Sequence, residues 1–231
     1  MKNLRTSTGP FSERPYYKDH EIEDICTDAL REVALLPTEP RPVRIDRFIE
    51  KRFGIVPSYE NLPEGILGLT RFTKDGVKDV VVANALDADS SVSAQRRIRT
   101  TLAHEAGHCL LHTHLFVLAT PPKSLFGDFT EPTKPKILCR DEPGSARYSG
   151  QWWEFQANTA MGYLLMPRAL VDKVVDEFLV PVGNLGGKRI DPLRHAAALL
   201  ALSETFDVNR IVAQIRLDAL FPKSEGGQLM L

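Results

Sequence analysis

The sequence has few cysteines and no long apolar run, and these absences exclude several classes of protein. Its three cysteines, Cys26, Cys109 and Cys139, form no CxxC pair and no even set, so a disulfide framework is excluded and a reducing compartment is favoured. No stretch approaches the roughly 18 apolar residues of a membrane span, and the N-terminal letters MKNLRTSTGPFSERPYY contain no apolar signal core. We therefore expect a cytoplasmic protein without a membrane partner.

An excess of charge of either sign is also lacking. The 231 residues include 29 Lys plus Arg and 30 Asp plus Glu, which gives a formal net charge of -1. The overall charge therefore does not attract nucleic acid or an anionic membrane, and such a partner would need a local patch. Hydrophobic residues make up 43%, which is enough for a sizeable core and excludes a disordered chain. The sequence does not indicate an oligomeric state.

The first half of the chain predicts a tail, two helices and a hairpin. Residues 1–18 mix polar, charged, Pro and Gly residues without periodicity, so we expect a flexible N-terminal tail followed by a single domain over 19–231. Apolar residues at helical spacing predict helices over 22–33 and 45–52. The β-rich runs ILGLTRF and VKDVVVANA flank an Asp-Gly turn, which predicts a small antiparallel sheet.

The second half predicts a helical body interrupted by one long insertion. A helix begins near Ser91 or Ser93 and continues to Leu110, after which scattered prolines over 113–150 indicate a long Pro-rich insertion. Helical spacing resumes over 152–165 and, after Pro167, to residue 178; a C-terminal helical pair over 191–221 comprises helices 192–206 and 209–220. The predicted fold class is α+β, mostly helical, with the small antiparallel sheet packed against the helix that follows the hairpin.

That helix carries the string HEAGH, which fits a metal site. Residues four apart lie about 40° apart on one helix face, so His104 and His108 can reach one ion. A catalytic zinc site has three protein ligands and an open fourth position, and Glu105 flanks the ion as a general base. The HExxH spacing therefore predicts a catalytic metal site that holds one zinc ion per chain, although Mn²⁺ or Fe²⁺ could use similar ligands.

Three residues are candidates for the third ligand. His114 lies ten residues after His104 but lacks the glycine, here replaced by Leu111, that would turn the backbone to the metal. His112 lies about 12 Å along the helix axis from His104, too far to share its ion. We interpret His112 as a residue of the core or of the edge of the metal site. The alternative is that His112 forms a hydrogen bond to one of the metal ligands. We favour Glu154 as the third ligand.

Glu154 lies on the later helix over 152–165. That helix could pack against the HEAGH helix through Trp152, Phe155 and Leu165. Asn158 lies one turn after Glu154 on the same face, which suits a hydrogen bond to a ligand histidine.

The combination of HEAGH with the downstream strings EFQAN and YLLMP resembles the ImmA/IrrE family of zinc-dependent metallopeptidases. The resemblance runs from about residue 45 to about residue 220. It implies a zincin-like fold with His104, His108 and Glu154 as ligands and Glu105 as general base. It also implies cleavage of a regulatory protein such as a repressor. The insertion between His108 and Glu154 is longer than the family pattern, which affects substrate access but not the ligand set.

For peptide hydrolysis, the sequence supplies a base and candidates for an oxyanion donor. Glu105 would take a proton from water and return it to the leaving amine. Tyr148, just before the Glu154 helix, and His195, near the start of a later helix, are the candidate donors. An exposed sheet edge could hold the substrate as an added strand.

The alternative to an enzyme is a metal-stabilised regulatory module that binds protein or DNA through its C-terminal helices. The string LSETFDVNRIVAQIRL resembles a helix-turn-helix with Arg210 and Arg216 on its second helix. Asp218 interrupts this basic surface, so nucleic acid is not the expected partner. A different possibility concerns Cys139, whose thiolate could occupy the fourth metal position and hold an enzyme latent.

Overall fold

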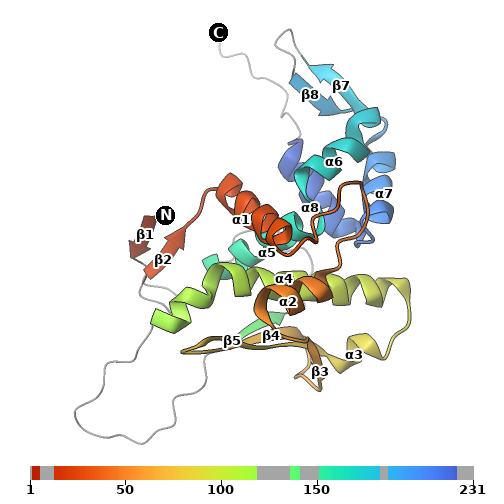
Figure 1. The fold of residues 1–231 in the computed structure, drawn as a ribbon. Coiled ribbons are helices and arrows are strands. Elements are labelled where there is room, and N and C mark those ends of the chain that lie inside the picture. Colours follow the sequence, from red (N-terminus) through yellow and green to blue (C-terminus); the bar gives the residue numbers. More distant parts are fainter. Residues whose placement is uncertain (1, 6–12, 119–135, 141–150, 183–186, 223–231) are drawn as a thin grey trace, which may run out of the picture.

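A long central helix, α4 (Val92–Leu118), separates a sheet from a group of helices in the computed structural model (Figure 1). The structure describes residues 2–5, 13–118, 136–140, 151–182 and 187–222. Residues 101–109 of α4 are all buried, because β4 (Ile66–Thr73) and β5 (Gly76–Ala83) pack on one side and α5 (Trp152–Leu165) packs on the other. The polar residues of HEAGH therefore lie in the interior, where they need partners.

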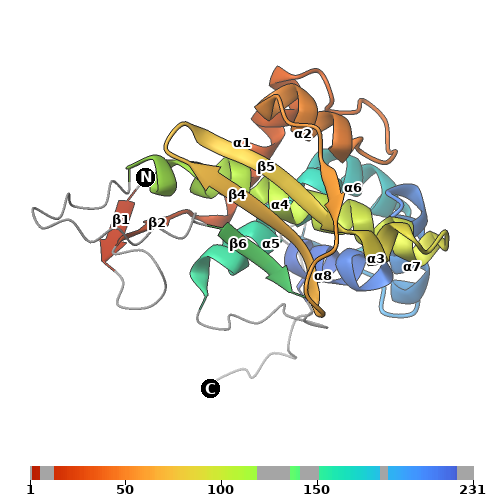
Figure 2. The same cartoon turned by 90° about the horizontal axis from the view of Figure 1, so that it is seen from below.

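The sheet has four strands in the order β3 (Ser58–Glu60), β5, β4 and β6 (Lys136–Arg140). The predicted hairpin is confirmed, with Gly76 at a φ of 124° after Asp75. Strand β3, for which the sequence makes no prediction, pairs parallel with β5, so the sheet is mixed rather than purely antiparallel. Three residues without apolar alternation give no local signal for that pairing. Figure 2 shows β6 beside β4, with which it pairs antiparallel.

The predicted start of the Pro-rich insertion is wrong. Residues 113–118 continue α4, because no Gly or Pro interrupts the helix before Pro121, and Thr113 donates its hydroxyl to the carbonyl of Cys109. The apolar run in KILCR forms β6 inside the insertion. The remaining insertion residues, 119–135 and 141–150, lie outside the described residues.

The other predicted helices are confirmed with small shifts in their bounds. They are α1 (Asp19–Glu32), α2 (Ile45–Phe53), α6 (Arg168–Val175) followed by the 3₁₀ turn Asp176–Phe178, α7 (His195–Thr205) and α8 (Arg210–Leu220). Helix α7 starts one turn later than predicted, because the Asp191 side chain accepts a hydrogen bond from the amide of Leu193 and forms a turn. The short helix α3 (Asn84–Asp87) and the strand pair β7 (Leu179–Val182) and β8 (Gly187–Ile190) had no clear sequence signal.

The N-terminal segment contains regular structure where the sequence predicts a flexible tail. Strands β1 (Lys2–Arg5) and β2 (Glu13–Tyr16) pair antiparallel, and Pro15 is buried. The Pro15 carbonyl accepts a hydrogen bond from the Gln156 side chain of α5. A polar segment of this kind can be ordered by backbone contacts, which leave no apolar pattern in the sequence.

The C-terminal pair α7 and α8 packs into the domain and does not present the basic surface of the alternative hypothesis. Arg216 is only 3% exposed, donates to the carbonyl of Met166 and to Glu23, and covers the ring of Tyr163. Arg216 is therefore a buried structural residue, which corrects its assignment to a nucleic-acid surface. Each helix in the described ranges is too short or too polar to serve as a bilayer span.

Candidate metal centre

A glycine inside HEAGH allows α4 and α5 to come together. A Cβ atom at Gly107 would lie 2.9 Å from the carbonyl oxygen of Ala157 and 3.1 Å from the Cβ of Ala160, so a larger residue would force the helices apart. Trp152 and Leu165 are buried as predicted, whereas Phe155 is 47% exposed. The close helix contact brings the N-terminal turn of α5 to the histidines of α4.

His104, His108 and Glu154 converge at this contact. Nε2 of His104 lies 2.9 Å from Nε2 of His108 and 3.1 Å from Oε2 of Glu154, and Nε2 of His108 lies 3.6 Å from Oε1 of Glu154. Both histidines are buried, and the Glu154 side chain is 19% exposed. The structure therefore brings together all three residues that the sequence predicts as ligands, in a group that could hold a metal ion.

The donor atoms lie close enough together to share one metal ion. Ligand atoms at about 2.0 to 2.2 Å from one tetrahedral centre are separated by roughly 3.3 to 3.6 Å. In the structure, one ligand atom from each of the three residues lies within 4.8 Å of the others, and the separation of the two Nε2 atoms, 2.9 Å, is shorter than this range. Two imidazoles with one carboxylate are a ligand set that suits zinc. Other divalent ions, such as Mn²⁺ and Fe²⁺, accept the same donors.

Glu105 is held beside the cluster by the neighbouring sheet. The hydroxyl of Thr70, on β4, donates a hydrogen bond of 2.6 Å to Oε2 of Glu105. Within the described part of the chain, the buried Oε1 of Glu105 has no hydrogen-bond partner. Burial raises the pKa of Glu105 to about 7, although the His104 charge and the Thr70 hydrogen bond oppose this rise. A carboxylate with one free oxygen and a pKa near neutrality can accept and return a proton.

The ligand side chains have partners on their other atoms. Oδ1 of Asn158 lies 2.9 Å from Nδ1 of His104, as predicted for a residue that orients a ligand. Nδ1 of His112 lies 2.9 Å from Nδ1 of His108, so the alternative interpretation of His112, a hydrogen bond to a ligand, fits this geometry. Nε2 of His112 lies 3.0 Å from Oε1 of Gln156.

The ionisation of these groups follows from burial and from their partners. Burial raises the pKa of Glu154, but hydrogen bonds to His104 and His108 outweigh it and lower the pKa overall. Burial, and then the charge of His108, lowers the pKa of His112 well below its ordinary value. Glu154 is therefore a carboxylate and His112 a neutral imidazole near pH 7.

The remaining candidates do not join the cluster in the described structure. His114 lies within α4, which continues without the backbone turn that would bring His114 to the metal. As predicted, His114 is not the third ligand of the group. His195 begins α7, which packs against α6 and α8. Tyr148 lies outside the described residues. The backbone of Cys139, in β6, pairs with that of Gly68, in β4, but the Cys139 side chain lies outside what the structure describes.

Sequence reasoning missed Thr70, Gly107 and Gln156. Thr70 lies 35 residues from Glu105 and carries no motif, so its contact could be found only from the packing of β4 on α4. Gly107 and Gln156 lie inside the quoted strings HEAGH and EFQAN. A glycine in a helix interior is unfavourable by about 1 kcal/mol relative to alanine, which was a signal of close helix packing.

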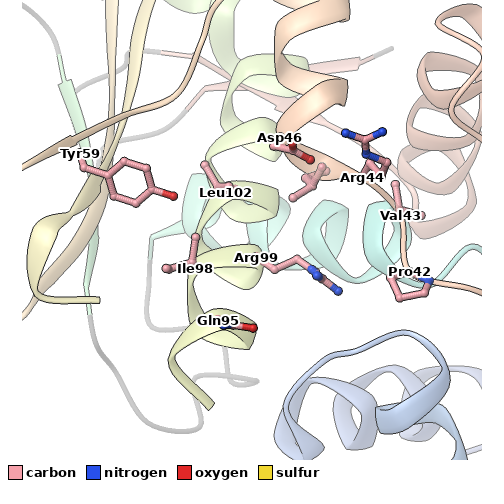
Figure 3. Close-up of a pocket in the computed structure, with 10 residues that line it drawn as sticks. Pro42, Val43, Arg44, Asp46, Tyr59, Gln95, Ile98, Arg99 and Leu102 are labelled. Atoms are coloured by element: carbon pink, nitrogen blue, oxygen red, sulfur yellow. The ribbon is translucent and has the colours of Figure 1, made fainter. Parts of the chain in front are cut away.

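A separate surface hollow of about 370 Å³ lies between the start of α2 and the first half of α4. Figure 3 shows Tyr59, Asp46 and Arg99 around it. None of the metal-centre residues lines this hollow.

Comparison of the chain with models of known protein families finds no match, and comparison with curated proteins finds none either. The resemblance to the ImmA/IrrE family therefore stays a prediction from the motifs.

Proposed function

We propose that this protein is a zinc-dependent endopeptidase of the HExxH type. The observation that carries the proposal is the buried convergence of His104, His108 and Glu154 beside a Glu105 oxygen without a described partner. A purely structural metal site has no need of a general base beside its ligands. The combination therefore favours catalysis over a metal-stabilised binding module.

The chain supplies positioning and proton transfer. His104, His108 and Glu154 would hold the ion, which when bound would supply a Lewis acid that polarises the scissile carbonyl and lowers the pKa of water. Oε1 of Glu105 would take a proton from the attacking water and return it to the leaving amine. Thr70 donates a hydrogen bond to the other oxygen of that carboxylate, Oε2, and so restricts rotation of the group. Asn158 and His112 orient the ligand rings.

The substrate would be an extended segment of a protein. Strand β6 is the last strand on its side of the described sheet, and its backbone could pair with such a segment as an added strand. The motif resemblance extends this proposal in three respects. The protein would belong to the ImmA/IrrE family, it would have a zincin-like fold, and its substrate would be a regulatory protein such as a repressor.

The first experiment measures zinc by elemental analysis in wild type, His104→Ala, Glu154→Ala and Glu105→Gln. We expect about one zinc per chain in wild type and in Glu105→Gln, and much less in the two ligand variants. A wild type that takes up no zinc would overturn the proposal.

A second experiment tests hydrolysis. The zinc-loaded protein is incubated with a library of unstructured peptides, and new termini are identified by mass spectrometry. Wild type should cleave peptides, whereas Glu105→Gln should bind zinc and leave the peptides intact. Equal cleavage by both proteins would remove Glu105 from the mechanism.

A further inference from the structure

A line of hydrogen bonds connects the metal centre to the N-terminal segment. It runs from His108 to His112 over 2.9 Å, from His112 to Gln156 over 3.0 Å, and from Gln156 to the carbonyl of Pro15 over 2.9 Å. The contacts join α4, α5 and β2, which lie far apart in the sequence. Proline has no N–H group, so this carbonyl is the sole backbone hydrogen-bonding group of Pro15.

Metal ligation by His108 at one end and the Pro15 carbonyl at the other determine which group donates in each of these hydrogen bonds. Nε2 of His108 faces His104 and Glu154, so a proton on this ring belongs on Nδ1 when Nε2 serves as a ligand. Nδ1 of His108 therefore donates to Nδ1 of His112, and Nε2 of His112 donates to Oε1 of Gln156. The amide nitrogen of Gln156 then donates to Pro15. Every donor in the line meets an acceptor.

Burial makes these bonds difficult to replace. His108 and His112 are 0% exposed, Gln156 is 7% exposed, and Pro15 is buried. A buried polar group that loses its partner destabilises the folded state, because water cannot reach it to form a replacement hydrogen bond. If the Pro15 carbonyl leaves, the Gln156 amide loses its acceptor and can turn away from His112. His112 then no longer fixes the ring of His108.

We propose that His112 and Gln156 are positioning residues that couple docking of the Glu13–Tyr16 strand to metal binding at His108. The inference rests on the proposed metal centre and adds a regulatory connection to it. Loss of a hydrogen bond that orients a metal ligand typically lowers metal affinity 10-fold to 100-fold. Coupling between two binding events is reciprocal, so the metal also strengthens docking of the strand.

The test uses the full chain and two measurements that do not depend on activity. Zinc affinity is measured by competition with a chelating dye, and amide hydrogen exchange is followed over residues 13–17 with and without zinc. In wild type, zinc should slow exchange in this segment several-fold or more. In Gln156→Ala, zinc affinity should fall about 10-fold and exchange of the segment should no longer respond to zinc.

One further variant distinguishes the hydrogen bond to His112 from the hydrogen bond to Pro15, and a second variant is a control. Gln156→Glu keeps an acceptor for His112 but has no amide to donate to Pro15, so it should retain more zinc affinity than Gln156→Ala and still lose the exchange response. Thr159→Ala is the control on the same helix, because the half-buried Thr159 has its hydroxyl bonded to the carbonyl of Phe155, away from Gln156, in the described structure. It should behave as wild type.

The outcomes distinguish this inference from the proposed function. A wild type that binds no zinc overturns both. A wild type that binds zinc with no change in exchange over residues 13–17 overturns the coupling alone, and so does a Gln156→Ala variant with wild-type affinity and response. The wild-type comparison with and without zinc requires no variant to fold.

Discussion

The Thr70 hydroxyl donates a 2.6 Å hydrogen bond to Oε2 of Glu105, and this contact joins strand β4 to the helix that carries both candidate histidine ligands. Glu105 is fully buried, so its carboxylate depends on this donor more than an exposed one would. The other carboxylate oxygen of Glu105, Oε1, has no hydrogen-bond partner among the described residues.

Replacing Thr70 by Val should raise the pKa of Glu105 above its value of about 7, because the Thr70 hydrogen bond stabilises the ionised carboxylate. The measurement is the carboxyl ¹³C chemical shift of Glu105 against pH in the metal-free protein. Thr70→Ser keeps a hydroxyl and should restore the wild-type pKa. An unchanged pKa in Thr70→Val would show that the hydroxyl does not hold Glu105.

The metal-free protein should lose stability as pH rises from about 4.5 to about 7. In this window folded Glu105 keeps a proton that the unfolded chain has released, because burial raises its folded-state pKa. The free energy of unfolding contributed by this group therefore falls by about 3 kcal/mol across the window. Urea unfolding at several pH values should show this fall in wild type relative to Glu105→Gln, and parallel pH profiles would contradict it.

Gly107→Ala should weaken both the fold and zinc binding, because its Cβ would meet the backbone of Ala157 at 2.9 Å. We expect a loss of about 1 to 3 kcal/mol in unfolding free energy and a fall in zinc affinity. The matched control is Gly162→Ala on α5, where the nearest atom is Cδ of Arg216 at 3.9 Å. This control should be neutral or stabilising by up to about 1 kcal/mol. Equal behaviour of the two variants in denaturant and zinc titrations would argue against a special role for Gly107.

Arg216→Ala should destabilise the protein by about 3 to 5 kcal/mol, because it leaves the largely buried Glu23 carboxylate without its partner. Arg210→Ala, on the exposed face of the same helix, should change stability by no more than about 0.5 kcal/mol. Thermal and urea unfolding provide the measurement. A small effect of Arg216→Ala would mean that the Glu23 pair contributes little.

The sequence predicted those parts of the structure whose signals are local. Helix α5 has the predicted bounds, and the Asp75-Gly76 turn joins β4 and β5 as expected. The spacing of HEAGH placed two histidines on one face, and Glu154 joins them in the structure. What the sequence could not supply were pairings between distant segments. The parallel contact of β3, the position of β6 beside β4 and the Thr70 hydrogen bond depend on packing of the whole domain.

The pair formed by Arg216 and Glu23 has a consequence for folding during synthesis. These residues lie 193 positions apart, so α8 can close onto α1 only after the chain has been translated through Arg216. Glu154 is made 62 positions before Arg216, and the three candidate ligands are therefore complete while that closure is still pending. An ion captured on the nascent chain would join α4 to α5 early, and it would give the later helices a preformed surface on which to pack.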